Sequence, residues 1–305
     1  MKKVLLTGAY KWTNDKIQAV KDLGFEADFI ADERLPFEND LSKYDAVVCN
    51  GLFLYNDIKK FTNLKFIQAT SAGLDRIPFD YVNEHNIKLC NARGVYSAPM
   101  AEWAVMRTLE IYKHSFSFYE SQKKCEWEKQ RDLLEISGKT VLVVGTGSVG
   151  TEVAKRFSAF DATIIGADIF ENKNEVYSKC VLVDEIENIL PECDIIVLTL
   201  PLTEETKRMF NKDKFDKMKT GTVLINIARG GIIDENAMIQ SLKCGRLMGV
   251  GLDVFETEPL PNDSPLWKMD NVLISPHNSF VSDRTNQRMF DVIIENLKAF
   301  NEEQR

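Results

Sequence analysis

Short apolar runs alternate with amphipathic stretches along the first hundred residues of this 305-residue chain. Runs rich in β-branched and aromatic residues predict strands, and the segment 14–23, which ends before Gly24, has the pattern of a helix. Strands that alternate with helices indicate βαβ units and hence a parallel, doubly wound sheet. The strands predicted here are residues 4–6, 27–30, 46–49, 66–69 and 88–90.

A second series of the same kind begins with the fully apolar run 141–144, and a helix is predicted at 151–158. The C-terminal stretch DVIIENLKAFNEEQR is also predicted to be helical. We therefore predict an α/β protein of two doubly wound parallel-sheet domains. The second, residues 98–280, is inserted into the first, residues 1–97 plus 281–305, and the C-terminal helix returns to the first. The further predicted strands are residues 163–166, 195–199, 223–227, 248–252 and 272–274.

The segment 98–124 links the two series and lacks glycine and proline beyond its first turn. It follows Ser97, a favoured N-cap residue, and Pro99 stands at an early helical position. We predict that this segment forms one long helix. The stretch after it, CEWEKQRDLLEISGKT, is polar and is predicted to be a loop.

Composition and charge narrow the possible partners. Hydrophobic residues make up 44% of the chain and charged residues 28%, as in ordinary globular proteins. The formal net charge of −8 argues against nucleic acid as the main partner, because phosphate contacts need a basic face. No run approaches the roughly 20 apolar residues of a membrane helix, and the start MKKVLLTGAY does not have the apolar run of a signal peptide.

The cysteines indicate a reducing compartment rather than a metal site or a disulfide framework. None of the six forms a CxxC pair, and no Cys/His cluster has the spacing of a zinc site. We therefore predict no metal, reduced thiols and a cytoplasmic location. The cysteines are Cys49, Cys90, Cys125, Cys180, Cys193 and Cys244.

A glycine loop, Gly145-Thr146-Gly147-Ser148-Val149-Gly150, fits the pattern GxGxxG. Alone, this pattern is weak evidence for a nucleotide site, because a loop that contains glycines can simply be a tight turn. Here it follows an apolar strand and opens a helix, and Asp168 lies 18 positions beyond Gly150 at the end of the next strand. Glycines let the backbone approach a pyrophosphate, and the helix N-terminus supplies N–H donors. Asp168 can accept hydrogen bonds from a ribose diol and would repel a 2′-phosphate, so the sequence predicts NAD rather than NADP.

Three charged residues follow the last three predicted strands of this domain. They are Arg229, Glu258 and His277. Taken singly, each has an ordinary structural explanation: a surface salt bridge, a loop carboxylate and a packed histidine. Ligands of open α/β sheets bind beyond the carboxyl ends of the strands, where these three side chains can converge.

These stretches together resemble the D-isomer-specific 2-hydroxyacid dehydrogenase family, which includes glyoxylate/hydroxypyruvate reductases, D-lactate dehydrogenases and phosphoglycerate dehydrogenases. The resemblance covers nearly the whole chain, and its motifs are specific for the family but not for the substrate. It implies an NAD-dependent oxidoreductase that interconverts 2-oxo acids and D-2-hydroxy acids. The matching stretches are SAGLDRIP, MAEWAV, VVGTGSVG, LPLTEETKRMFN, INIARGGIIDENAMIQSL, GVGLDVFETEPLP and SPHNSF.

The resemblance also implies a role for each matching site residue. His277 is expected to exchange a proton with the substrate's keto oxygen, with Glu258 paired to it. Arg229 is expected to bind the substrate's carboxylate or carbonyl oxygen, and Asp253 the nicotinamide carboxamide. The resemblance places the remaining substrate contacts at Ser71, Ala72 and Gly73, in the first domain.

The implied domain roles are a flavodoxin-like substrate domain and an inserted NAD-binding Rossmann domain. A homodimer is expected, with the helix after Ser97 at its interface. The expected cofactor-binding residues are Gly145, Gly147, Ser148, Val149, Gly150, Asp168, Leu200, Pro201, Thr206, Ile227, Ala228, Arg229, Asp253 and His277.

One position departs from the family pattern, and two alternative functions stay open. Many members carry small residues shortly after the histidine, whereas this chain has the bulky Phe280, which puts the transfer of a substrate from any one relative in doubt. A non-enzymatic NAD(H)-sensing regulator on the same fold is the main alternative. A formate-dehydrogenase-like hydride donor is disfavoured, because those relatives pair the histidine with glutamine and this chain has Glu258.

Overall fold

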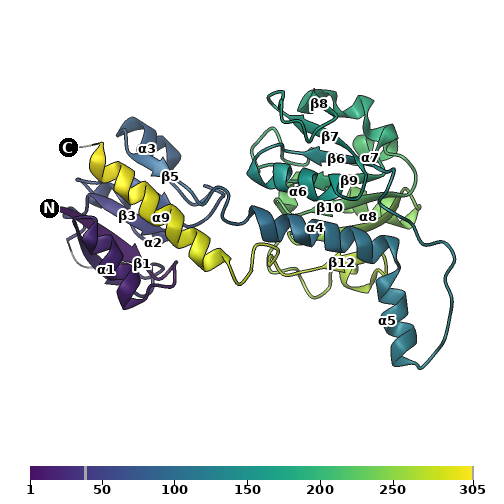
Figure 1. Ribbon diagram of the computed structural model, residues 1–305, viewed down its shortest axis with the longest axis horizontal. Helices are drawn as coiled ribbons and strands as arrows, with labels where there is room; N and C mark the ends of the chain where they lie inside the picture. The colour runs from purple at the N-terminus through teal and green to yellow at the C-terminus, as the bar shows by residue number, and fades with distance from the viewer. Residues whose placement is uncertain (38–39, 304–305) are drawn as a thin grey trace. The chain divides into compact units, whose positions relative to one another are not determined.

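A computed structural model describes residues 1–37 and 40–303, which form two compact units (Figure 1). The first unit comprises Met1–Tyr96 and the C-terminal segment from Ser282, and the second is Ser97–Val281. The chain therefore enters the second unit once and leaves it once. The predicted boundaries differ from these junctions by one residue each.

The first unit is built on a five-stranded parallel sheet in the order β2-β1-β3-β4-β5. This is the flavodoxin-like order, whose direction reverses between β1 and β3. The strands are β1 (Lys2–Thr7), β2 (Phe25–Ile30), β3 (Ala46–Cys49), β4 (Phe66–Ala69) and β5 (Lys88–Cys90).

Alternate residues of these strands fill two separate cores, one on each face of the sheet. Val4 and Leu6 pack towards α1 (Asn14–Asp22) and α9 (Thr285–Glu302), whereas Leu5 packs on the opposite side. That opposite side is covered by α2, a 3₁₀ turn and α3. These elements are α2 (Leu52–Tyr55), η1 (Ile58–Lys60) and α3 (Phe79–Glu84).

Helix α9 belongs to the first unit because one stripe of its surface is apolar. Met289, Ile293, Leu297 and Phe300 recur about every four residues and are all at most 2% exposed. The ring of Phe300 stacks on that of Phe66 of β4, with 4.8 Å between centroids. Burial of each such side chain contributes roughly 1.5–3 kcal/mol, which is sufficient to hold the returning segment on the sheet.

The second unit has a seven-stranded parallel sheet in the order β12-β11-β10-β9-β6-β7-β8. Its direction reverses between β6 and β9, as in the Rossmann fold. The predicted fold class is therefore confirmed. The strands are β6 (Thr140–Val144), β7 (Thr163–Asp168), β8 (Lys179–Leu182), β9 (Ile195–Leu198), β10 (Thr222–Asn226), β11 (Leu247–Leu252) and β12 (Val272–Ile274).

Helices cover both faces of this sheet. One face packs on α4 (Ser97–Tyr112) and α6 (Ser148–Ser158), and the other on α7 (Lys212–Lys217) and α8 (Glu235–Lys243). Short 3₁₀ turns complete the connections. They are η2 (Val183–Asn188), η3 (Leu190–Glu192), η4 (Gly230–Ile232) and η5 (Pro265–Lys268).

The prediction of one long helix over 98–124 is wrong. Helix α4 ends at Tyr112 and α5 (Ser115–Lys123) begins after a break, where His114 has a left-handed conformation with φ 49°. The loop after α5 contacts the chain at this break. Leu134 N donates to Tyr112 O at 3.0 Å, and the His114 ring is hydrogen-bonded to the Gln130 side chain. These contacts come from residues far along the chain, which local helical pattern cannot reveal.

The predicted cap of this helix is also not made. Ser97 is the first residue of α4, its side chain is buried, and its Oγ has no hydrogen-bond partner within the described residues. Among those residues no helix is long and apolar enough to cross a membrane. All six cysteines are free, and no group of three or more His, Cys, Asp or Glu side chains in the described ranges could hold a metal.

Candidate functional site

The carboxyl ends of all the strands in the second unit meet at one edge of its sheet, because every pairing is parallel. The glycine loop follows β6, and the segment starting with Leu200 follows its neighbour β9. These two loops flank the point where the strand order reverses, which is where open α/β sheets bind ligands.

Two glycines of the loop occupy positions that admit no side chain. Gly145 has φ +99°, and a Cβ there would lie 2.9 Å from Leu200 N. A Cβ on Gly150 would lie 1.9 Å from Gly145 O, so this glycine lets α6 pack against its own strand. Around Gly147 a Cβ would meet nothing within 4 Å. The loop is thus closed on its inner side and open at Gly147, just before the N-terminus of α6, as a pyrophosphate cradle requires.

Asp168 ends β7 and is bound to the glycine loop. Its Oδ2 accepts hydrogen bonds from Thr146 N at 2.6 Å and from Thr146 Oγ1 at 3.0 Å, and its Oδ1 accepts one from Ile169 N at 2.8 Å. Thr146 O in turn accepts from Asn172 Nδ2 at 2.9 Å. Sequence reasoning missed Thr146, since it occupies a variable position of the motif.

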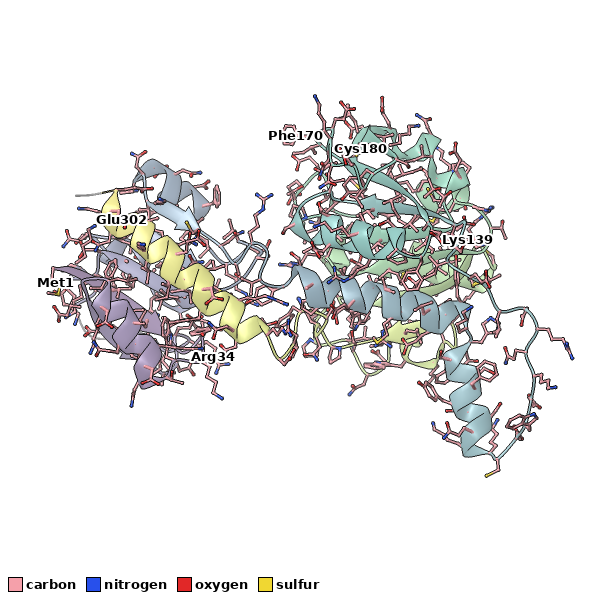
Figure 2. All side chains as sticks on the ribbon, in the orientation of Figure 1. Met1, Arg34, Lys139, Phe170, Cys180 and Glu302 are labelled. Atoms are coloured by element: carbon pink, nitrogen blue, oxygen red, sulfur yellow. The ribbon has the colours of Figure 1, made fainter. Side chains whose placement is uncertain are left out.

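The two residues after Asp168 are apolar and open to solvent. Ile169 is 65% exposed and Phe170 is 75% exposed. Figure 2 shows Phe170 projecting from the surface near the β7 and β8 side of the domain, where Cys180 also lies. Burial raises the pKa of the Cys180 thiol, so this cysteine stays protonated at neutral pH.

Residues after β9 and β10 form a second wall beside the glycine loop. This wall contains three buried apolar residues, Leu200, Ile227 and Ala228, which add no charge to the site. Thr206 closes the turn after β9, because its hydroxyl donates to Pro201 O at 2.8 Å.

His277 and Glu258 are brought together from segments 19 residues apart. The distance between His277 Nδ1 and Glu258 Oε2 is 2.8 Å, and the side chains are 41% and 37% exposed. Glu258 Oε1 accepts a hydrogen bond from Phe255 N at 3.1 Å, which fixes the carboxylate. Because a carboxylate only accepts, Nδ1 carries a hydrogen, and Nε2 is the ring nitrogen left for a ligand.

Asp253 holds the turn that carries His277. Its carboxylate accepts hydrogen bonds from Ser275 Oγ, from Asn278 N at 2.7 Å and from Ser279 N at 2.9 Å. Its backbone oxygen accepts one from His277 N at 2.8 Å. These bonds stabilise a left-handed backbone at His277, with φ 50°. The Asp253 side chain is only 1% exposed, so a direct contact with nicotinamide stays a prediction.

Arg229 and Phe280 complete the polar and apolar groups at this edge. Arg229 follows β10, is half-buried, and its Nη1 donates to Ala228 O at 2.7 Å. The ring of Phe280 lies edge-on to that of His277, with 6.1 Å between centroids and 82° between planes. Phe280 is 37% exposed, so the departure from the family pattern lies next to the predicted proton donor.

The three predicted substrate residues of the first unit follow β4. Ala72 is exposed, whereas Ser71 and Gly73 are half-buried. The Ser71 hydroxyl donates to Gly73 O at 2.7 Å, so it is used within the loop. Tyr96 OH donates to Thr70 O, and burial raises the pKa of this hydroxyl, so it remains a neutral donor.

Comparison with known proteins identifies a family. Residues 105–279 match the family model described as D-isomer specific 2-hydroxyacid dehydrogenase, NAD binding domain. The hydroxypyruvate reductase of Thermotoga maritima is 35% identical over 239 residues, which cover 77% of each chain. The D-3-phosphoglycerate dehydrogenase of Archaeoglobus fulgidus is 34% identical over 241 residues, covering 78% of this chain and 46% of that protein. The chain thus spans about half the length of the phosphoglycerate dehydrogenases it matches.

Solved structures agree over nearly the full length. The D-lactate dehydrogenase of Aquifex aeolicus, solved with NAD and lactic acid, has a TM-score of 0.78 and 27% identity and covers 98% of this chain and 96% of its own. An NADPH-dependent glyoxylate/hydroxypyruvate reductase of Sinorhizobium meliloti, solved with NADP and sulfate, has a TM-score of 0.78 and 25% identity. It covers 100% of this chain and 96% of its own. Similar structures therefore contain either cofactor.

Proposed function

This chain belongs to the D-isomer specific 2-hydroxyacid dehydrogenase family, and we propose that it interconverts a 2-oxo acid and a D-2-hydroxy acid with NADH and NAD⁺. The observation that carries the proposal is the 2.8 Å contact between His277 and Glu258 at the carboxyl edge of the sheet. Glu258 accepts the hydrogen bond from Nδ1, which leaves Nε2 as the ring nitrogen that can exchange a proton with a reacting carbonyl. The glycine loop lies at the same sheet edge, so a dinucleotide and a proton donor share one site.

In the reduction, bound nicotinamide supplies the hydride that adds to the keto carbon. His277 donates its Nε2 proton to the keto oxygen, which becomes the product hydroxyl, and takes a proton back in the oxidation. Glu258 holds the Nδ1–H. Arg229 binds the carboxylate or the carbonyl oxygen by charge-assisted hydrogen bonds and stabilises the developing negative charge. The N–H groups of Ala72 and Gly73 hold the substrate carboxylate.

A substrate panel tests this proposal. We expect saturable NADH oxidation with at least one of glyoxylate, hydroxypyruvate, pyruvate, 2-oxoisocaproate, phenylpyruvate and 3-phosphohydroxypyruvate. Glyoxylate, hydroxypyruvate and a phosphoglycerate-type acid are the first candidates, since curated relatives carry these activities in their names. Binding of NADH without turnover of any acid would contradict the proposal and favour the NAD(H)-sensing regulator.

The proposed cofactor is NAD rather than NADP. The support is the position of Asp168, whose carboxylate is fixed by Thr146 at the end of β7. A fixed carboxylate accepts hydrogen bonds from a ribose diol, and it repels a phosphate at the 2′ position. Ile169 and Phe170, which follow it, bring no positive charge to offset this repulsion.

We expect Asp168→Ala to lower the preference for NADH over NADPH, measured as the ratio of kcat/KM, by about tenfold or more, the effect of roughly 1.4 kcal/mol. Glu171→Ala is the matched control, because it makes the same change of net charge three residues further along an exposed loop. Direct titration of both cofactors, followed by fluorescence, gives a readout that is independent of turnover. A wild-type protein that prefers NADPH would contradict the assignment.

We also propose a cytoplasmic homodimer that forms through the cofactor domain, with the segment after Ser97 at its interface. The support for the dimer is α5, which has no buried residue although it carries Phe116, Phe118 and Tyr119, each between 38% and 58% exposed. Apolar surface of this kind marks an interface. The support for the location is the set of free cysteines.

Sedimentation tests the interface. The wild type is expected to sediment as a dimer, and the double variant Phe116→Ser, Tyr119→Ser as a monomer at the same concentration. Phe170→Ser is the matched control, since it removes an aromatic ring that is 75% exposed elsewhere in the same unit. A monomeric wild type, or an equal effect of all the substitutions, would refute the proposed interface.

A further inference from the structure

In the loop after β4, three backbone carbonyl groups accept hydrogen bonds from the protein, whereas three backbone N–H groups donate none to its described residues. Ser71 O accepts a hydrogen bond from Ala92 N at 3.0 Å, Ala72 O from Asn91 Nδ2 at 2.7 Å, and Gly73 O from Ser71 Oγ at 2.7 Å. Over residues 1–37 and 40–303, the N–H groups of Ala72, Gly73 and Leu74 donate to no protein acceptor. Successive backbone N–H groups without a protein acceptor are the donors from which anion-binding concavities are built.

Each carbonyl contact fixes the direction of the next amide, because the peptide group is planar and trans. The bond to Ser71 O orients the Ala72 N–H, and the bond from Asn91 to Ala72 O orients the Gly73 N–H. The bond within the loop, from Ser71 Oγ to Gly73 O, orients the Leu74 N–H. Of the two side chains involved, only that of Asn91 comes from outside the loop.

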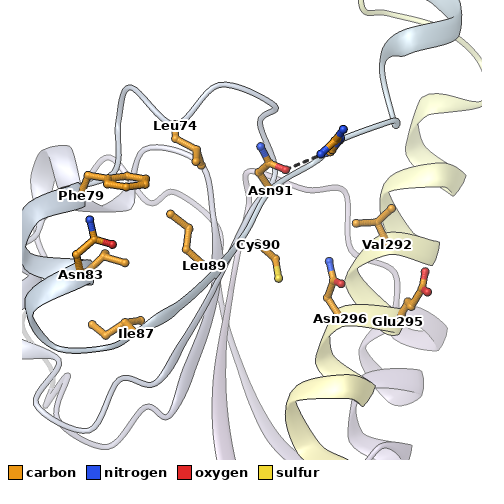
Figure 3. Close-up of a pocket in the computed structure, with 12 residues that line it drawn as sticks. Leu74, Phe79, Asn83, Ile87, Leu89, Cys90, Asn91, Val292, Glu295 and Asn296 are labelled. Carbon is orange, nitrogen blue, oxygen red and sulfur yellow. Dashed lines mark hydrogen bonds between the residues drawn. The ribbon is translucent and has the colours of Figure 1, made fainter. Parts of the chain in front are cut away.

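The orientation of the Asn91 amide is itself determined by the chain. Asn91 follows β5, and its Oδ1 accepts a hydrogen bond from Arg93 N at 3.2 Å. Since Arg93 N can only donate, Oδ1 must face it, and Nδ2 is left to face Ala72 O. Figure 3 shows Asn91 where the chain leaves β5, on the wall of a surface pocket of about 720 Å³ that Asn83 of α3 also lines.

We propose that Asn91 is a positioning residue for the substrate's carboxylate. It holds the peptide between Ala72 and Gly73 so that the Gly73 N–H, together with the Ala72 and Leu74 N–H groups, is directed at an anion. This inference rests on the proposed function, because the anion is the carboxylate of the 2-oxo acid. Without the Asn91 amide, the peptide is free to rotate and its N–H loses its fixed direction.

Two substitutions of Asn91 separate this role from a contribution to folding. Asn91→Ala removes the donor. Asn91→Asp keeps the shape and the acceptor for Arg93 N, but places a carboxylate oxygen against Ala72 O. We expect both variants to raise KM for the acid that the wild type reduces best by about tenfold, the upper effect of one hydrogen bond, with kcat changed less and Kd for NADH unchanged. Asn83→Ala is the matched control, since it removes an asparagine from the same pocket.

The outcomes distinguish this inference from the proposed function. A wild type that reduces 2-oxo acids, with KM unchanged in both Asn91 variants, would overturn the role of Asn91 alone. A selective rise in KM in both variants, with Asn83→Ala unaffected, would support it. If no acid is turned over, the proposed function fails, and the loop is then tested with oxalate.

In protein labelled with ¹⁵N-glycine and saturated with NADH, oxalate should shift the Gly73 amide resonance of the wild type and leave it unmoved in Asn91→Ala. The chain has 16 glycines, and Gly73→Ala identifies the signal. A Gly73 resonance that does not respond in the wild type, or that responds equally in Asn91→Ala, would refute the role of Asn91.

Discussion

Replacing His277 with alanine is expected to lower kcat by about 10²–10⁴, the usual effect of losing general acid–base help, while NADH still binds. The reason lies in the geometry of the pair. Glu258 is hydrogen-bonded to Nδ1 and to Phe255 N, so it holds the ring but cannot replace its proton at Nε2. Steady-state kinetics with the best acid of the panel measure the loss, and fluorescence titration with NADH measures binding.

The left-handed backbone at His277 calls for a second variant. Alanine at φ 50° is strained, and the turn held by Asp253 can shift with it. Asparagine tolerates this conformation better than alanine, so His277→Asn keeps the turn while it removes the imidazole and its transferable proton. Both variants should lose a similar amount of kcat. His85→Ala, in an exposed histidine of the first unit, should leave kcat unchanged. A loss of only a few-fold in both His277 variants would show that another group transfers the proton.

The strands that carry the site could be predicted because each is a short apolar run followed by polar or glycine residues. The run 272–274 coincides with β12, and the run 141–144 lies within β6. Parallel pairing then brings the residues that follow the strands to one edge, however far apart they lie in sequence. The choice of Arg229, Glu258 and His277 as candidates needed no more than this rule and the chemistry of their side chains.

Contacts between distant segments could not be predicted in the same way. At the break near His114, Gln130 and Leu134 contact the end of α4, and the local pattern of apolar residues does not predict these contacts. Strand β8 was missed because only Val181 of its four residues is buried, so its apolar signal is weak. The helices α3, α7 and α8 are short, or rich in charged and polar residues, and were missed for the same reason.

Hydrogen-bond partners within the site were the least predictable feature. The bonds from the turn of His277 to the Asp253 carboxylate were not predicted, whereas the contact of Asp253 with the cofactor stays a prediction. Nothing in GVGLDVFETEP reveals these bonds, because the sequence shows only an aspartate directly after a strand. Thr146 donates two hydrogen bonds to Asp168, and Asn91 donates one to Ala72; such bonds depend on the register of neighbouring loops.

Replacing Arg229 with lysine is expected to lower kcat/KM for the 2-oxo acid by about 10²–10³, the usual cost of removing a group that stabilises developing negative charge. A guanidinium presents a planar fork of donors, and one arm of this fork, Nη1, already donates to Ala228 O at 2.7 Å. A lysine ammonium is a single flexible point charge, which cannot keep the contact with Ala228 O and bind the substrate with the same geometry.

Both kinetic constants should change, since the carboxylate is bound in the ground state and the carbonyl is polarised only in the transition state. KM therefore rises through the first effect and kcat falls through the second. Arg208→Lys is the matched control: this exposed arginine pairs with Glu256 at 3.3 Å in the same unit, and lysine can keep an ion pair of that kind. If Arg229→Lys behaved like this control, Arg229 would have no part in binding the substrate or in the chemistry.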